Sequence, residues 1–375
     1  MSETTTLCAQ VTTGGGHPKQ RDSNLELFRI ILMFFIIAHH YVVNSSLLDY
    51  VDMQHITGND IFLQIFAMFG KPAINAFTLI TGYFMVRARV TVARFLRTFL
   101  EVKFYDFLFY LIFLLSGYAS FSVMDLFTTV FSISYWAGHY YTGTYIMLFL
   151  LMPLLNVLVQ NMTKKQYQYL LIVLLVYFTG FSTFLLHNNF SFVGWLVTMY
   201  LVGGYISLYP IQAFQSAKVG AAGMAVSIFL MIASILVVDF IGIRFDFDRY
   251  DYMYSDANKF LALTSAVFSF IFFKNLKIPY NKVINRLAAP IFGILLIHAH
   301  SDTMRRLIWQ DIFHCPQYYD SPYLILHAVG TVVAVYLVCW ALDSLRIRFI
   351  EKPLFGRLKT SKWLLKLEEK MRGIL

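Results

Sequence analysis

The run ELFRIILMFFIIAHHY, residues 26–41, is an apolar segment with one arginine near its start and two histidines near its end. Arg29 and His40 are eleven positions apart. On an α-helix this spacing is about three turns, so both side chains lie on nearly the same face, roughly 16 Å apart along the axis. The run therefore predicts a membrane-spanning helix with a cation near one end and an imidazole near the other.

The composition excludes an ordinary soluble globule. Hydrophobic residues make up 58% of the 375 residues, charged residues make up only 14%, and the mean hydropathy is +0.62. Soluble domains carry about 25% charged residues, so too little polar surface is available here to cover a globule. We therefore expect an all-α, polytopic membrane helical bundle in the cell membrane, in contact with lipid. The net charge of +9 is attributed to its loops rather than to nucleic-acid binding.

Ten apolar segments predict about ten transmembrane helices. They cover residues 25–44, 68–86, 98–117, 141–160, 168–187, 192–209, 218–241, 256–273, 290–308 and 323–345. Residues 1–24 are rich in Thr, Gly and Ser and are expected to form a mobile cytosolic tail. Residues 25–350 then form the transmembrane domain. Residues 351–375 form a cytosolic interfacial tail, with an amphipathic helix over residues 360–375.

The basic residues indicate the orientation of these segments. If the N-terminus is cytosolic, 24 of the 30 Lys and Arg residues fall on the cytosolic side. The outward loops at residues 45–59, 118–140 and 188–191 contain none. Because cytosolic loops of membrane proteins are enriched in Lys and Arg, both termini are predicted to be cytosolic and the number of spans to be even.

No metal site is predicted. The three cysteines have no spacing typical of a zinc site or a disulfide framework. The loop at residues 244–256 contains Asp246 and Asp248, which have the spacing of a glycosyltransferase metal motif, together with several tyrosines. A motif of three residues is a weak signal, so a solvated loop is favoured over a metal-binding or sugar-binding one.

Two interpretations are open for His40 and two for Arg29. His40 can accept a hydroxyl proton near neutral pH, or it can be a structural histidine that is hydrogen-bonded to a neighbouring helix. Arg29 can be a topological anchor paired with Glu26, or it can hold an anion whose reactive end points toward His40. The shared helix face favours the functional reading of both residues, and His39 is expected to support His40.

Four arginines follow the second span: Arg87, Arg89, Arg94 and Arg97. Arg94 and Arg97 are three positions apart, so they share a helix face. Guanidinium groups bind phosphates through paired N–H donors. A phosphate site is therefore one interpretation, and contact with lipid headgroups near a cytosolic loop is the other.

The ninth span contains an unusual density of polar side chains: His298, His300, Asp302, Arg305 and Arg306. His298 and Asp302 are four positions apart, as are Asp302 and Arg306, so a continuous helix would carry all three on one face. A buried structural network and an acceptor-binding site are both compatible with this pattern.

These residues together resemble the acyltransferase 3 family of integral membrane acyltransferases over residues 22–355. Members share an Arg or Lys, ten residues and then a His in the first span, and an Arg-x-x-Arg after the second span. The family's motifs are matched in order by Arg29 and His40, by residues 75–84 with Thr81 in place of a serine, by Arg94 and Arg97, by residues 145–156 and by residues 292–300.

The resemblance implies transfer of an acyl group, usually acetyl, from cytosolic acyl-coenzyme A. The acceptor would be a hydroxyl of a cell-surface polysaccharide, a lipid-linked glycan or a similar extracytoplasmic molecule. Some relatives carry a fused extracytoplasmic hydrolase-like domain. This chain ends 30 residues after its tenth predicted span, so we expect it to act alone or with a separate extracytoplasmic partner.

Roles for the candidate residues follow from the resemblance. His40 would act as the general base or carry the acyl group, and Arg29 would orient the donor. The four arginines would bind coenzyme A phosphates. The residues that would serve the acceptor side, or be structural, are His298, His300, Asp302 and Arg306.

Three other functions remain open at the level of sequence. A transporter or flippase of anionic lipid-linked sugars would use the same polar groups to line a path. The other large family of multi-spanning acyltransferases also uses a histidine within the membrane, but it would lack the Arg29–His40 spacing and the arginine pair. A glycosyltransferase would need Asp246 and Asp248 to bind a metal.

Overall fold

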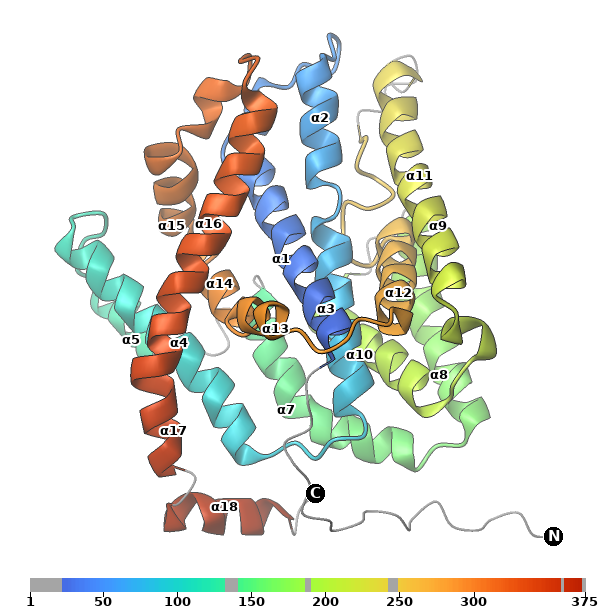
Figure 1. The fold of residues 1–375 in the computed structure, drawn as a ribbon, viewed down its shortest axis with the longest axis vertical. Helices are drawn as coiled ribbons and strands as arrows, with labels where there is room; N and C mark the ends of the chain where they lie inside the picture. Colours follow the sequence, from blue (N-terminus) through green and yellow to red (C-terminus); the bar gives the residue numbers. More distant parts are fainter. Residues whose placement is uncertain (1–21, 132–140, 186–189, 242–248, 359–360, 373–375) are drawn as a thin grey trace.

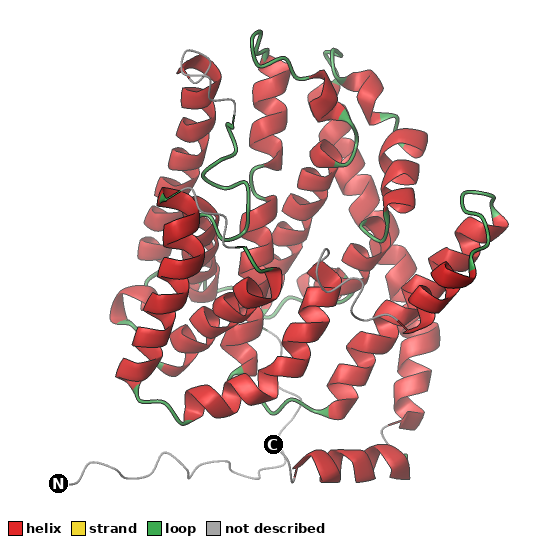
Figure 2. Ribbon diagram, turned by 180° about the vertical axis from the view of Figure 1, so that it is seen from behind, coloured by secondary structure: helices red, strands yellow, loops and turns green. Residues whose placement is uncertain are grey.

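A computed structural model describes residues 22–131, 141–185, 190–241, 249–358 and 361–372, and within these ranges every regular element is helical (Figure 1, Figure 2). The longer helices are α1 (Ser23–Val43), α2 (Gly58–Ala67), α3 (Gly70–Met85), α4 (Val92–Leu115), α5 (Val123–Phe131), α7 (Tyr141–Gln160), α8 (Lys164–Leu175), α10 (Phe192–Leu208), α11 (Ala217–Ile241), α12 (Phe260–Asn275), α14 (Ile291–His298), α16 (Leu324–Arg346) and α18 (Lys362–Arg372). Short helical pieces connect them: α9 (Phe181–Phe184), α13 (Lys282–Ala288), α15 (Asp302–Arg306) and α17 (Lys352–Leu358). The all-α fold class is confirmed for the described residues.

Helix α1 is the centre of the bundle. It contacts α2, α3, α12, α13, α14 and α16, so neighbours surround it on most sides (Figure 1). Most of its apolar residues are buried, among them Phe28 at 1% exposed and Ile37 and Tyr41 at 0%, whereas Val43 at its end is 41% exposed. Arg29, His39 and His40 each keep part of their surface accessible although the helix is central. The first predicted span therefore is a helix, and its polar residues lie inside the protein.

Helices α3 and α10 approach each other closely through glycines. A Cβ atom on Gly82 would lie 2.1 Å from the backbone oxygen of Tyr200, and one on Gly203 would lie 2.3 Å from that of Leu79. Small residues allow this approach of two backbones within a membrane. Beside this contact, the buried Asn75 accepts a hydrogen bond from the Trp195 indole at 2.8 Å. The Gly-containing segment at 192–209 therefore forms a helix that is packed into the core.

The predicted number of spans is not confirmed. Six helices are long and apolar enough to cross a membrane, and a seventh span results if the bent pair formed by residues 282–298 and 302–312 counts as one. Helices α10 and α12 are apolar but shorter, and α4 is long but carries Arg, Glu, Lys and Asp side chains. Each of the ten predicted segments coincides with helical structure, while the count of ten and the cytosolic placement of both termini stay predictions.

The ninth predicted segment is not a continuous helix. Helix α14 ends at His298, and α15 begins after Ser301, whose hydroxyl accepts a hydrogen bond from the backbone N–H of Met304 at 3.2 Å. The two parts of this segment are bent by 99° relative to each other. The expectation that His298, Asp302 and Arg306 share one helix face is therefore wrong. Serine hydroxyls compete for backbone N–H groups, so Ser301 starts a new helix where the spacing suggested a continuous one.

The C-terminal part of the chain is also helical beyond the predicted domain boundary. Helix α16 continues through η7 (Ile347–Glu351) into α17, which makes 35 helical residues from Leu324 to Leu358 and places residue 350 inside a helix. Helix α18 is present where an amphipathic helix was predicted, and it lies across the end of the bundle where α4 begins and α17 ends (Figure 1, Figure 2). We call this end of the bundle the α18 end. Leu364 is buried there at 2% exposed, whereas Trp363 is 59% exposed, so these two apolar residues do not share a contact face.

Candidate active site

Two histidines from distant parts of the chain meet in the core. The Nδ1 atom of His40 lies 3.1 Å from Nε2 of His298, 258 positions away in the sequence. The Nδ1 atom of His298 lies 2.6 Å from the backbone oxygen of Ile294, one turn earlier in α14. The imidazole of His298 is fully buried, while that of His40 is only partly buried. The break in the ninth segment places His298 at the end of α14, where it can reach His40.

The hydrogen bonds define which nitrogen of each ring carries a proton. A carbonyl oxygen only accepts, so His298 must hold its proton on Nδ1. A charged imidazole in a buried site is unfavourable when none of the described residues offers it an anionic partner, so His298 is neutral and its Nε2 accepts. His40 must then donate from Nδ1, and in the neutral form of His40 this leaves Nε2 without a proton. The second ring fixes the tautomer of the first, as the orienting group does in a nucleophile–base–orienter triad.

Two cations lie near this pair of rings, which we call the His40–His298 dyad. The charges of Lys71 and Arg305 both act on His40. Arg305 also acts on His298, and Lys71 also acts on His39. Nδ1 of His39 lies 3.0 Å from the backbone oxygen of Ala67, so this ring holds the end of α2 against α1 rather than joining the dyad.

His300, Asp302 and Arg306 of the ninth segment have partners outside the dyad. His300 lies 3.5 Å from a carboxylate oxygen of Asp106 in α4 and packs against the ring of Phe109. Asp302 is bonded to Arg305 at 2.8 Å, and Arg306 extends toward Asp311 with 71% of its side chain exposed. Of the residues proposed for the acceptor side, the structure therefore brings only His298 to His40.

Arg29 has a carboxylate partner and an aromatic environment. Its Nη1 lies 3.2 Å from both carboxylate oxygens of Glu26, and its side chain is 28% exposed. Its charge also acts on the hydroxyls of Tyr141, Tyr145 and Tyr336. Glu26 therefore neutralises Arg29 in part, while the accessible part of the guanidinium remains next to the tyrosines of α7.

An aromatic row connects the neighbourhood of Arg29 with a cavity. Tyr141, Tyr145 and Phe149 are spaced four apart on α7, so they share one face. The rings of Tyr141 and Tyr145 are 5.8 Å apart, and those of Tyr145 and Phe149 are 6.5 Å apart. Phe149 in turn packs against Phe95 of α4 and, with it, lines the cavity. This row runs from the cavity into the core of the bundle.

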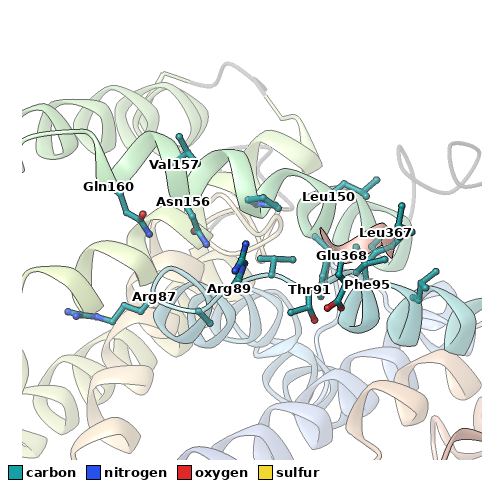
Figure 3. Close-up of a pocket in the computed structure, with 16 residues that line it drawn as sticks. Arg87, Arg89, Thr91, Phe95, Leu150, Asn156, Val157, Gln160, Leu367 and Glu368 are labelled. Carbon is teal, nitrogen blue, oxygen red and sulfur yellow. The ribbon is translucent and has the colours of Figure 1, made fainter. Parts of the chain in front are cut away.

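The cavity lies at the α18 end and has a volume of about 560 Å³. It is bounded by the loop between α3 and α4, by α4 and α7, and by Leu367 and Glu368 of α18 (Figure 3). Arg89 points toward α7 in this cavity, whereas Arg87 extends away and bonds to Ser207 of α10 (Figure 3). The α7 side chains Asn156 and Gln160 donate to the backbone oxygens of Met85 and Val86, at 2.9 and 3.4 Å. They hold in place the loop between α3 and α4, residues 86–91, which we call the arginine loop.

The remaining two arginines of the predicted phosphate site lie beside the cavity. Arg94 donates to the backbone oxygen of Arg89 at 3.2 Å, and so supports the arginine loop. Arg97 forms an ion pair with Glu351, although 55% of its side chain is exposed. Glu351 is itself bonded to Arg346 at 2.9 Å. Arg97 therefore joins the α18 end of the bundle to a buried ion network.

That network is almost completely buried. Arg346, with 6% of its side chain exposed, is bonded to Asp343 at 2.5 Å and to Glu101 at 2.8 Å. The Tyr105 hydroxyl donates to the same carboxylate oxygen of Asp343, at 2.7 Å. A Cβ atom on Gly293 would lie 2.1 Å from the Asp343 carboxyl carbon, so α14 rests directly on this network. The network therefore supports the half-helix that carries His298.

Metal ligands do not gather anywhere in the described residues: no group of three His, Cys, Asp or Glu side chains could hold an ion there. Asp246 and Asp248 of the weak glycosyltransferase motif lie outside the described residues. The neighbouring tyrosines are in part structural, because Tyr254 is 5% exposed and the Tyr252 hydroxyl donates to the backbone of Thr183 at 2.9 Å.

The site thus combines a histidine dyad within a helical membrane bundle and an arginine-lined cavity at one end of that bundle, which together define a class of integral membrane enzyme. Residues 22–343 match the family model of the acyltransferase 3 domain, and the chain belongs to that family. The family is that of the acyltransferases, so the protein is a membrane acyltransferase. No curated protein and no solved structure matches the chain.

Three residues of the site were not selected from the sequence. Arg305 stood next to Arg306 in the same polar cluster, and only the start of α15 at Asp302 decides which of them faces the core. Lys71 was visible as a rare cation outside the cytosolic segments of the predicted topology. No sequence pattern pointed to Glu368, because it is one of several charged residues on an amphipathic helix.

Proposed function

We propose that this protein transfers an acetyl group from cytosolic acetyl-coenzyme A to a hydroxyl of a cell-surface polysaccharide, a lipid-linked glycan or a similar acceptor. The observation that supports it most directly is the contact at 3.1 Å between Nδ1 of His40 and Nε2 of His298, in a chain that belongs to the acyltransferase 3 family. An oriented neutral imidazole is the group that abstracts a hydroxyl proton near neutral pH.

In this proposal the His40–His298 dyad moves one proton. Nε2 of His40 takes the proton of the acceptor hydroxyl as the oxygen attacks the thioester carbonyl. The C–S bond then breaks, and the coenzyme A thiolate takes up a proton. The same lone pair could instead attack the carbonyl and form an acyl-histidine, which the acceptor oxygen then resolves. His298 serves both routes, because it stabilises the charge that develops on His40.

The donor would enter at the α18 end, which the distribution of Lys and Arg predicts to be cytosolic. Arg89 and Arg87 are proposed to bind the coenzyme A phosphates in and beside the cavity, with Arg94 and Arg97 in support. The aromatic row of Tyr141, Tyr145 and Phe149 offers an apolar track for the pantetheine arm from the cavity toward Arg29. Arg29 is proposed to orient the donor, with the thioester directed along α1 toward His40, since its guanidinium lies beside this row.

The experiment that tests this function is acetyl transfer by purified protein in lipid nanodiscs. Radiolabelled acetyl-coenzyme A is the donor, and an envelope glycan extract of the source cells is the acceptor. We expect wild type to release coenzyme A and to label the glycan. His40→Ala should abolish transfer, and His298→Ala should lower kcat by roughly 10²-fold or more, because general-base catalysis contributes about 10²–10⁴-fold.

His300→Ala is the matched control for His298→Ala, because His300 contacts Asp106 and not the dyad. It should retain most of the activity. A wild-type protein that binds no acetyl-coenzyme A and leaves its thioester intact in the presence of acceptor would refute the acyltransferase mechanism. That result would favour a transporter of anionic lipid-linked sugars, in which the histidines line a path.

A further inference from the structure

A buried carboxylate without a cationic partner lies between α2 and α11. Asp239, near the end of α11, is 3% exposed, and Gln64 of α2 is 1% exposed. Nε2 of Gln64 donates to Oδ1 of Asp239 at 3.2 Å. Within the described part of the chain no Lys, Arg or His forms an ion pair with Asp239. Helix α11 is long and apolar enough to cross a membrane, so this charge is costly unless another group compensates it.

The second oxygen of each of these two side chains is unsatisfied. Oδ2 of Asp239 and Oε1 of Gln64 are buried, and neither has a hydrogen-bond partner among the described residues. Each belongs to the same planar group as the atom that is bonded, so both lie within a few ångström of one contact. A rotation of the Gln64 amide by half a turn would only place its oxygen against the carboxylate. The contact between the two side chains therefore leaves two acceptor oxygens to be satisfied by another group.

Tyr254 adds a third unsatisfied oxygen to this region. It is 5% exposed, and its hydroxyl has no partner among the described residues. Tyr254 packs in one apolar cluster with Ile235, which lies one turn before Asp239 on α11. Ile65, the neighbour of Gln64 on α2, packs against the same cluster. Helix α2, helix α11 and the segment before α12 thus bring three buried, unsatisfied oxygens together.

Asp60 makes the charge balance of this region more negative. It lies one turn before Gln64 on α2 and is 0% exposed. Its carboxylate accepts hydrogen bonds from the hydroxyls of Tyr319 at 2.5 Å and Thr57 at 2.7 Å. These hydroxyls stabilise the charge of Asp60 but do not neutralise it. The described residues therefore place two buried carboxylates along α2 and α11 and pair neither of them with a basic side chain.

We propose that Asp239, Gln64 and Tyr254 bind a monovalent alkali cation, Na⁺ or K⁺, between α2 and α11. The inference does not depend on the proposed acetyl transfer. One cation would contact both unsatisfied acceptor oxygens and neutralise a buried charge, whereas a water molecule would leave that charge uncompensated.

The ligand set suits a monovalent ion better than a divalent one. It contains one carboxylate and two neutral oxygens, whereas Ca²⁺ takes about six to eight oxygen ligands and Mg²⁺ usually keeps several of its waters. A site with neither His nor Cys is also unlike the sites that bind zinc. A single positive charge would balance the one carboxylate that lacks a partner.

The test measures the melting temperature of the full-length protein in detergent, at equal ionic strength, in NaCl, KCl or choline chloride. Choline is too large for a buried site, so its salt controls for ionic strength. We expect Na⁺ or K⁺ to raise the melting temperature by roughly 2 °C or more for each tenfold increase in concentration above half-saturation. Equilibrium dialysis with radioactive sodium or rubidium, as an analogue of potassium, should show saturable binding. The ion with the lower half-saturating concentration is the preferred one.

Variants assign the binding to the two side chains. Asp239→Asn keeps the shape of the residue and removes its charge, so it should bind no ion and melt at the same temperature in all three salts. In choline chloride it should be at least as stable as wild type, because no uncompensated charge is buried. Gln64→Met should raise the half-saturating ion concentration by roughly tenfold, since one ligand to a charged group is lost. Asp125→Asn is the matched control, because Asp125 is exposed on α5, and it should keep the wild-type ion dependence.

Each opposite result would overturn the proposal. A wild-type protein that melts at one temperature in all three salts and binds no ion would show that water or a protonated carboxylate satisfies this contact. An unchanged ion dependence in Asp239→Asn would place the ion elsewhere, and a response to Ca²⁺ or Mg²⁺ alone would exclude a monovalent site. If Asp239→Asn does not fold, the half-saturating concentration of Gln64→Met decides the question. None of these measurements uses acetyl transfer, so the cation site and the proposed function can fail separately.

Discussion

Arginines serve opposite purposes in two neighbouring regions of this protein. In the buried ion network, Arg346 has three carboxylate partners, Asp343, Glu101 and Glu351, and 6% of its side chain is exposed. In the arginine loop, Arg89 is exposed and points into the cavity (Figure 3). The difference indicates that the network holds helices together, whereas the loop has charge available for a ligand. Arg97 lies between them, paired with Glu351 but more than half exposed.

The largest expected effect comes from breaking the network. Arg346→Met would leave three buried carboxylates with Arg97 as their remaining cation, and removing one partner of a buried pair costs about 3–5 kcal/mol. We expect a large fall in the thermal stability of the detergent-solubilised protein, measured by its melting temperature. Activity should fall with it, because α14 and His298 rest on Asp343.

Arg348→Met is the control, because Arg348 is exposed and lies over the ring of Phe349. Its loss should cost about 1 kcal/mol or less. Equal melting temperatures for Arg346→Met and wild type would show that the network adds nothing to stability, and the contrast between the two regions would then have no basis.

The second prediction compares substitutions of Arg89 and Arg97. Arg89→Gln should raise the KM for acetyl-coenzyme A by roughly tenfold without lowering the melting temperature, since one charge-assisted hydrogen bond is worth about 1.5–3 kcal/mol. Arg97→Gln should change both quantities, because it removes a donor-side charge and a partner of Glu351. Kinetics and thermal unfolding of the same preparations check this. A normal KM in both variants would remove the donor site from the arginine loop.

The smallest effect is expected at Glu368 of α18. Its carboxylate lines the cavity and accepts a hydrogen bond from the backbone N–H of Ala93, in the first turn of α4, at 3.3 Å. A helix N-terminus attracts anions, so the start of α4 would also favour a phosphate of the donor. The negative charge of Glu368 at this position would repel that phosphate. Glu368→Gln should lower the KM for acetyl-coenzyme A by about two- to threefold at low salt, and less at high salt.

Glu369→Gln is the matched control, because its neighbouring carboxylate is exposed and does not line the cavity. Its KM should equal that of wild type at every salt concentration. If both substitutions lower the KM equally, the effect is a general one of net charge, and α18 has no specific part in donor binding.

Much of the fold could be predicted because it depends on local patterns. Each apolar segment was long enough to require a helix, and the structure has helical residues in all ten. The number of membrane spans could not be predicted from the lengths of the apolar segments. Ser301 breaks the ninth segment, and the charges of α4 are compensated by partners far away in the sequence, such as the Arg346–Glu101 pair.

The candidate site could be predicted only in part, because only some of its features are local patterns of the sequence. The spacing of Arg29 and His40 is a property of one helix, so it could be read directly. The partner of His40 could not be chosen by spacing, because the helix-face argument assumed a continuous ninth span. His298 reaches His40 since α14 stops there. Arg305 is more buried than Arg306 because α15 starts a new helical phase.

The sequence by itself determined the class of this protein, its helices and the polar residues that they carry, because hydrophobic length, helical spacing and family motifs are all local properties of the chain. Only the tertiary structure decided which of those residues act together. It joined His40 of α1 to His298 of α14. It also left the arginine loop exposed and buried the ion network of Arg346. These arrangements depend on where helices end and bend, and not on the spacing of residues along the chain.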